Sequence, residues 1–139
     1  MVRPTPSEST DLVRRAHEAL NSGDMDALIA LCDSGFRLDM SDRVFNPAVY
    51  KGHEGIRRFH SEVRDVWESY VWEPEELIDV GSDVVALLRS SGRGRGSGVE
   101  VQRETAMVWS AREGRAIAMR FFRNRDEALK NRPQGEPRS

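Results

Sequence analysis

The sequence predicts an α+β fold, and three observations point to it. Two segments before residue 33 and one after residue 53 place apolar residues at the spacing of helices. From residue 71 onward the chain favours strands, separated by turns that contain Gly, Asp and Ser. Helices followed by a meander of antiparallel strands are typical of α+β domains. With 139 residues, 38% of them apolar and 32% charged, the chain has the size and composition of one folded domain.

The first two helices are short and meet at a turn. The first covers about residues 9–21, and Gly23 is expected to end it. Asp24 can cap the second helix through its side-chain oxygen. The apolar residues of the second helix fall at i, i+3, i+4 and i+7, namely Met25, Leu28, Ile29 and Cys32. Cys32 is the only cysteine, so no internal disulfide can form, and its place on the apolar face predicts a small buried side chain.

A strand and a third helix follow. Phe36, Leu38 and Met40 alternate with polar residues, which is the pattern of a half-buried strand. The third helix carries a charged face and, opposite it, one apolar stripe. This stripe consists of Ile56, Phe59, Val63, Val66, Trp67 and Tyr70.

Four further strands are expected at about residues 71–80, 84–88, 99–111 and 115–123. Turns at Gly81-Ser82-Asp83 and Glu113-Gly114 join neighbouring strands. The glycine-rich residues 92–98 favour a hairpin connection, because they lack the Lys-Ser/Thr ending of a phosphate-binding loop. Residues 1–8 and 131–139 are expected to be flexible tails around a single domain of residues 9–130.

The segment from residue 16 to residue 56 reads AHEALNSGDMDALIALCDSGFRLDMSDRVFNPAVYKGHEGI. In element order and spacing it resembles the opening of the nuclear transport factor 2-like superfamily, in the SnoaL-like branch. Gly96-Ser97-Gly98-Val99 and Arg125–Leu129 are similar to later parts of the same proteins. The resemblance implies a cone, in which three N-terminal helices pack on a strongly curved mixed or antiparallel sheet around an apolar cup. It also implies polyketide cyclase-like relatives, while related domains carry many activities or none.

Asp39 is the first candidate catalytic residue. By resemblance to ketosteroid isomerase it lies within one residue of the proton-shuttling base, and by resemblance to limonene epoxide hydrolase it meets an amide residue that holds the attacking water. A carboxylate in the cup would be partly desolvated, which would raise its pKa and favour a role as base. The alternative is a solvent-exposed Asp near a strand end.

The catalytic partners of those enzymes are absent. The isomerase's oxyanion Tyr corresponds to Ala16, its protonated Asp to Met107, and the epoxide hydrolase's acid to Phe121. Without hydrogen-bond donors no developing charge is stabilised. Neither of these two activities therefore carries over to this chain.

His60 is the second candidate catalytic residue, since helical spacing turns it toward the sheet. Scytalone dehydratase, which the chain also resembles in architecture, uses histidines in its cup. The alternative is a His at the edge of the core with one hydrogen bond. His17 and His53 are expected at the surface, and three scattered His without ligand spacing predict no metal site. No cofactor is expected.

Several residues are predicted to line the cup. Arg103 is the one charge on its face of the long strand and could pair with Asp39 or hold a ligand's carbonyl or carboxylate. The apolar lining suits a flat hydrophobic ligand, although the same residues could also fill the core. It consists of Trp67, Met107, Trp109, Met119 and Phe121.

Two functions stay open. One is a non-catalytic protein that binds a small hydrophobic ligand, and the other is a cofactor-independent isomerase, cyclase or dehydratase with Asp39 as base. The formal charge of −2 disfavours nucleic-acid binding. No segment resembles a membrane span or signal peptide, so no membrane partner and a cytoplasmic location are expected. Ala106 and Val108 on the outer face of the sheet predict a homodimer.

Overall fold

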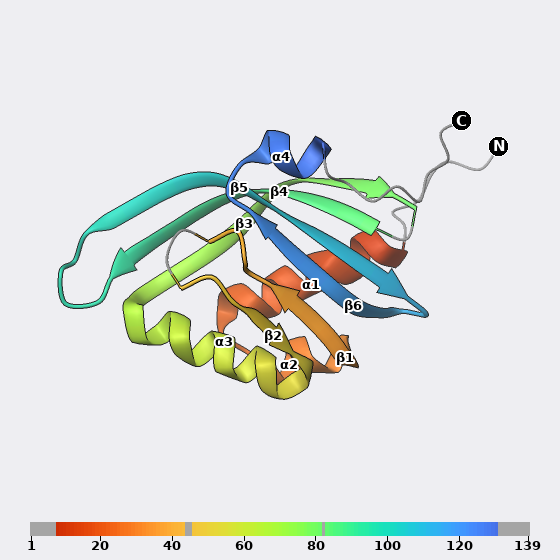
Figure 1. The fold of residues 1–139 in the computed structure, drawn as a ribbon, viewed down its shortest axis with the longest axis horizontal. Helices are drawn as coiled ribbons and strands as arrows, with labels where there is room; N and C mark the ends of the chain where they lie inside the picture. The colour runs from red at the N-terminus through yellow and green to blue at the C-terminus, as the bar shows by residue number, and fades with distance from the viewer. Residues whose placement is uncertain (1–7, 44–45, 82, 131–139) are drawn as a thin grey trace.

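The computed structural model describes residues 8–43, 46–81 and 83–130, which form helices around one curved six-stranded sheet (Figure 1). The expected tails at 1–8 and 131–139 lie outside the described residues, apart from Glu8, the first residue of α1. The elements in chain order are α1 (Glu8–Ser22), α2 (Met25–Ala30), β1 (Cys32–Asp39), β2 (Val49–Lys51), α3 (Gly52–Val66), β3 (Trp67–Val80), β4 (Asp83–Gly94), β5 (Glu100–Arg112), β6 (Arg115–Phe122) and α4 (Arg125–Lys130).

The strands lie in the order β2-β1-β6-β5-β4-β3. All neighbours are antiparallel except β1 and β6, which run parallel, so the sheet is mixed. Helices α1, α2 and α3 cover one face, and α4 lies against β4, β5 and β6 on the other face (Figure 1). The predicted α+β cone is therefore confirmed.

Side chains alternate between two apolar clusters because successive residues of a strand face opposite sides of the sheet. The inner cluster joins the sheet to α1–α3 and holds most of the buried residues, among them Ile56, Phe59 and Trp109. The outer cluster lies under α4 and consists of Val85, Ala106, Val108, Phe122 and Ala128. Ala106 and Val108, which suggested a partner chain, are thus covered by the chain's own last helix.

Helix α1 is fastened to the free edge of the sheet. Strand β3 is an edge strand, so part of its backbone has no neighbouring strand to bond. Asn21 satisfies both polar groups of Trp72: its carboxamide oxygen accepts from the Trp72 N–H at 2.8 Å, and its nitrogen donates to the Trp72 carbonyl at 3.1 Å. His17 Nδ1 also lies 3.0 Å from that carbonyl. Two side chains of α1 therefore hold β3 at one point.

Two helix boundaries predicted from the sequence were wrong. Helix α2 ends at Ala30, and Cys32 begins β1, although it is buried as expected. Helix α3 ends at Val66, so Trp67 belongs to β3, where it pairs with Gly94. Aromatic side chains favour strands, and a long partner strand was available in β4. The short strand β2 was not predicted.

The tip of the β4–β5 hairpin caps the C-terminal end of α3. The Arg95 N–H donates to the carbonyl of Val66 at 2.9 Å, and its Nε donates to the carbonyl of Arg64 at 2.8 Å. These bonds satisfy carbonyls that have no partner within the helix. The glycine-rich segment is thus a hairpin connection, as predicted, although Gly92 and Gly94 still belong to β4.

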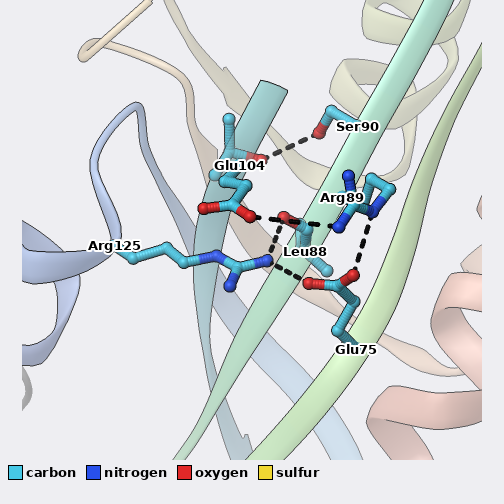
Figure 2. A network of polar contacts seen from close by, with 7 residues as sticks. Glu75, Leu88, Arg89, Ser90, Glu104 and Arg125 are labelled. Atoms are coloured by element: carbon cyan, nitrogen blue, oxygen red, sulfur yellow. Dashed lines mark hydrogen bonds and ion pairs between the residues drawn. The ribbon is translucent and has the colours of Figure 1, made fainter. Parts of the chain in front are cut away.

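Polar contacts fix α4 on the outer face, as Figure 2 shows. Arg125 Nη2 donates to Glu75 Oε1 of β3 at 2.5 Å and to the Leu88 carbonyl of β4 at 2.8 Å. Arg89 donates to the other Glu75 oxygen at 2.9 Å. These bonds lower the pKa of Glu75, with Arg125 the larger cause. The first residue of α4 is thereby tied to two strands that lie far from it in sequence.

Candidate functional site

A pocket of about 260 Å³ lies between α3 and the inner face of the sheet. Helix α3, strands β3, β5 and β6, and the loop after β1 all contribute to it. Its lining residues are Met40, Arg43, Asn46, Glu62, Val63, Val66, Trp67, Tyr70, Trp72, Val101, Arg103, Thr105, Phe121 and Arg123. Two wider surface grooves, beside α1, are lined mostly by charged and polar residues. We therefore take the pocket under α3 as the candidate site.

One wall of the pocket is aromatic and comes from β3. The ring centroids of Trp67 and Tyr70 lie 5.0 Å apart, and those of Tyr70 and Trp72 lie 4.6 Å apart. Trp72 also contacts Phe59 of α3, at 5.8 Å between centroids. Such tilted and edge-to-face contacts are favourable for aromatic rings. The wall is therefore held in place by packing before any ligand arrives.

Gly92 makes room for this wall. A Cβ atom at Gly92 would lie 2.4 Å from Cδ2 of Tyr70, closer than real Cβ atoms come to another carbon. The pairing of Tyr70 with Gly92 across β3 and β4 lets the phenol ring lie against the partner backbone. The glycine at this position thus fixes the place of an aromatic residue of the pocket.

One side of the pocket, next to α3 and the loop after β1, is polar. The Tyr50 hydroxyl donates to Glu62 Oε1 at 2.5 Å and accepts a hydrogen bond from Arg43 Nη2 at 2.8 Å. Burial is the main cause that raises the pKa of Tyr50, and Glu62 adds to it while Arg43 opposes it. The Arg43 guanidinium also lies 5.8 Å from the Tyr50 ring centroid. Arg43, Tyr50 and Glu62 therefore form one connected group at the pocket.

A second polar group lies on the sheet side. Ser90 and Thr105 are almost completely buried, and their hydroxyl oxygens lie 2.8 Å apart. The Tyr70 hydroxyl lies near Ser90. Burial is the largest effect on the pKa of Tyr70 and raises it, although the nearby Arg103 lowers it. Tyr70 thus keeps its proton at neutral pH beside an exposed guanidinium.

The predicted lining residues separate into two sets. Trp67, Phe121 and Arg103 line the pocket. Met107 and Met119, by contrast, are buried at 0% and 1% exposure in the inner core. Trp109 is also a core residue, at 2% exposure. The alternative of a filled core therefore describes the deep half of the cup, while its outer half stays open.

Asp39 does not lie in the pocket. It is paired in register with Arg120 of β6, whose guanidinium lies 5.0 Å from the Phe122 ring of the outer cluster. Burial raises the pKa of Asp39, but hydrogen bonds from Ser41 and the charges of Arg120 and Arg37 outweigh it, so the net pKa is lowered. The expected rise in pKa was wrong. Strand alternation turns Met40, the next residue, toward the pocket instead.

The two histidines are placed differently from the expectation. His60 is half-buried on α3 near Gly23 and does not line the pocket; burial, and then Arg64, lower its pKa. His17, expected at the surface, is 1% exposed. Its Nε2 accepts a hydrogen bond from Trp109 Nε1 at 3.2 Å. Burial lowers the pKa of His17 to about 4, and the bond to the Trp72 carbonyl only partly offsets this.

Sequence reasoning missed several pocket residues, among them Tyr70, Glu62 and Arg43, and also Tyr50, which bonds two of them. Tyr70 was assigned to a helical stripe, and Glu62 to the solvent-facing side of the same helix. Arg43 and Tyr50 drew no attention, because neither belongs to a periodic pattern in the sequence. The useful signal was the spacing of Tyr70 and Trp72, which alternates as a strand does, whereas Trp67 is out of phase with them and a register irregularity lies between Trp67 and Ser69.

Neither a metal-binding cluster nor a membrane-spanning helix is found among the described residues. No group of three or more His, Cys, Asp or Glu within residues 8–43, 46–81 and 83–130 is arranged to hold a metal ion. Among the same residues, no helix is long and apolar enough to cross a membrane.

Comparison with known proteins gives the family. The family model described as SnoaL-like domain matches residues 13–119. The structure is similar to an NTF2-like protein of unknown function from Burkholderia pseudomallei K96243, with a TM-score of 0.75 and 20% identity over 89% of this chain and 96% of that one. It is also similar to TerC co-crystallized with polyporic acid, with a TM-score of 0.77 and 16% identity over 89% and 97% of the two chains.

A putative polyketide cyclase from Xanthomonas campestris pv. campestris has a TM-score of 0.71 and 19% identity, over 90% of this chain and 96% of that one. No curated protein matches the chain in sequence. At these identities the solved structures establish the fold alone. The family match extends over most of the chain, however, and together with the fold it shows that the chain belongs to the SnoaL-like domain family.

Proposed function

We propose that this SnoaL-like chain binds a small hydrophobic molecule in the pocket under α3 without transforming it. The observation that carries the proposal is the wall formed by Trp67, Tyr70 and Trp72, which offers flat apolar surface to a ligand. TerC, which shares the fold, was co-crystallized with the small molecule polyporic acid. That structure supports small-molecule binding by this architecture.

The pocket's size limits the ligand. Its volume of about 260 Å³ lies just below the roughly 300–1,000 Å³ typical of ligand sites. A compact molecule, such as one with one or two fused rings, suits that space. The open half of the cup ends where Met107, Trp109 and Met119 fill the core.

An enzyme is the second candidate function, of the cofactor-independent isomerase, cyclase or dehydratase type. Asp39 lies on the other face of the sheet, which removes the support for it as the base. One specific observation keeps the enzyme open: Glu62 lines the pocket and accepts a hydrogen bond from Tyr50. In that case Glu62 would be the base, because it is the carboxylate among the lining residues. Ala16, Met107 and Phe121 supply no donor for a developing oxyanion, so the donor would have to be Tyr70, Thr105 or Arg103 of the same pocket.

Native mass spectrometry of the protein purified from its own source tests the proposal. We expect a small aromatic ligand that leaves when the protein is denatured and is recovered chemically unchanged after prolonged incubation with it. Val63→Trp, which fills the pocket from α3, should lose the ligand while keeping the circular dichroism of the wild type. Conversion of the ligand during incubation would favour the enzyme. Equal retention by Val63→Trp would contradict the pocket as the site.

A homodimer and a cytoplasmic location stay predictions. Helix α4 covers Ala106 and Val108, so these two residues no longer support a dimer. The outer face keeps partly exposed apolar residues beside α4, among them Ile78, Val80 and Leu87. Light scattering at high micromolar concentration would decide between a monomer and a dimer.

A further inference from the structure

The pocket has an unbalanced charge. Three of its lining residues are cationic, namely Arg43, Arg103 and Arg123, and one is anionic, Glu62. Arg123 Nε lies 3.7 Å from a carboxylate oxygen of Asp42. Among the described residues, Arg103 forms no ion pair and no hydrogen bond in the structure.

The carboxylate of Glu62 does not balance Arg103, because it already has partners. It accepts a hydrogen bond from the Tyr50 hydroxyl, which Arg43 also contacts, and lies 3.7 Å from Arg58 Nε. These partners belong to α3 and to the segment between β1 and α3. Arg103, which lies on β5 opposite Ser90 of β4, belongs to the sheet side.

The neighbours of Arg103 on the sheet side are hydrogen-bond donors. The hydroxyls of Ser90 and Thr105 are hydrogen-bonded to each other at 2.8 Å, and the Tyr70 hydroxyl lies near Ser90. Each hydroxyl has one proton to donate, and the bond between Ser90 and Thr105 uses one of the three, so donor protons remain. Tyr70 and Thr105 both line the pocket. A ligand oxygen at this wall can therefore receive one of the remaining protons.

We propose that the molecule bound in this pocket carries an acidic oxygen group, a carboxylate or an ionised enol or phenol, held by Arg103 together with the hydroxyls of Tyr70 and Thr105. This inference rests on the proposed function and specifies the ligand class. The ring system of the ligand packs on Trp67 and Trp72, and its negative charge lies toward the outer end of the long strand. An unpaired cation beside hydroxyl donors is an arrangement that favours an anion over a neutral group.

A matched pair of probes tests the charge alone. We would titrate 2-naphthoate and 2-naphthamide, which share the ring system and differ in the charge of the head group. Calorimetry at pH 7 should give wild-type affinity at least about tenfold higher for naphthoate, since a hydrogen bond to a charged group contributes about 1.5–3 kcal/mol and each factor of ten is about 1.4 kcal/mol. Arg103→Gln should abolish this preference and leave the affinity for naphthamide unchanged.

Arg112→Gln is the matched control. It lies on the same strand as Arg103, is exposed, removes the same charge and does not line the pocket. It should keep the wild-type preference for naphthoate. Tyr70→Phe keeps the aromatic wall and should lower the affinity for naphthoate more than that for naphthamide.

The outcomes of these titrations distinguish a failure of the acidic-ligand proposal from a failure of the hydrophobic-pocket proposal. Equal wild-type affinity for both probes would overturn the acidic ligand and leave the hydrophobic pocket standing. An Arg103→Gln variant that weakens both probes equally would also overturn it, because the side chain would then act by packing. If neither probe bound, both proposals would fall.

Discussion

The buried His17 makes stability depend on pH in a predictable way. The Trp109 indole N–H can only donate a hydrogen bond, and the Trp72 carbonyl can only accept one. His17 lies between them, so Nε2 accepts from Trp109 and Nδ1 carries the proton that is donated to Trp72. A second proton would have to be placed on Nε2, facing the indole N–H. The folded protein therefore requires a neutral imidazole.

The size of this pH-dependent loss of stability follows from the lowered pKa of His17. The pKa of His17 is 6.5 in the unfolded chain and about 4 in the fold, so the folded state binds the proton later as pH falls. A lowered His pKa leaves stability unaffected above about pH 6.5 and reduces it progressively between about 6.5 and 4. At pH 5 the free energy of unfolding is lower by about 2 kcal/mol than at neutral pH. Below pH 4 this loss levels off at about 3 kcal/mol, since one pKa unit corresponds to about 1.4 kcal/mol.

Urea denaturation of the wild type and of His17→Leu, between pH 7 and pH 5, measures this loss. The variant has no imidazole, while every carboxylate is shared, so the difference between the two free energies of unfolding isolates His17. We expect the wild type to lose about 2 kcal/mol relative to the variant over this range. Asn21 still bonds the Trp72 carbonyl in the variant, which preserves the contact of α1 with β3. A difference that does not change with pH would refute a neutral buried His17.

Three further substitutions test separate parts of the structure. Gly92→Ala should destabilise the domain by about 1–3 kcal/mol in urea denaturation, because the new methyl group would clash with the Tyr70 ring and overpack the site. Gly94→Ala is the control, since its new methyl group would approach only the exposed Ser97 hydroxyl. Equal losses of stability in the two variants would contradict this explanation. Arg125→Ala should speed hydrogen exchange in α4 and under it, because the contacts with Glu75 and the Leu88 carbonyl are lost, and unchanged exchange would show that the outer cluster alone holds the helix. Asp39→Asn should leave the affinity for 2-naphthamide unchanged, because Asp39 faces the outer side of the sheet; a large loss of affinity would return Asp39 to the site.

The sequence predicted the fold more fully than the site, for a physical reason. Periodicity shows which residues are buried, and burial determines how α1, α3 and the long hairpin pack. Where apolar residues fit both the helical and the strand period, periodicity does not distinguish a helix from a strand. Val66, Trp67 and Tyr70 continued the helical stripe, yet the partner backbone of β4 was available and Trp67 became the first residue of β3.

The residues of the site are brought together by the packing of separate elements, which periodicity along the sequence does not predict. Trp67, Phe121 and Arg103 were predicted correctly as cup-facing residues, whereas the resemblance to known enzymes directed attention to Asp39. A shift of one position along β1 decides that residue's face, and the alternation with Leu38 already placed Asp39 opposite the core. The hydroxyl-bearing residues Tyr70, Ser90 and Thr105 come from three strands, β3, β4 and β5, whose pairing the sequence alone does not reveal.

The three tryptophans allow the most direct test of the central claim, that the pocket under α3 binds a small hydrophobic molecule. Trp67 and Trp72 line the pocket, while Trp109 is buried in the core and bonded to His17. In ¹⁵N-resolved NMR spectra each indole N–H gives its own signal, so 2-naphthamide can be titrated against all three at once. We predict that the signals of Trp67 and Trp72 shift with a common affinity while that of Trp109 stays in place. Saturating probe that leaves Trp67 and Trp72 unmoved, or moves Trp109 alone, would contradict the claim.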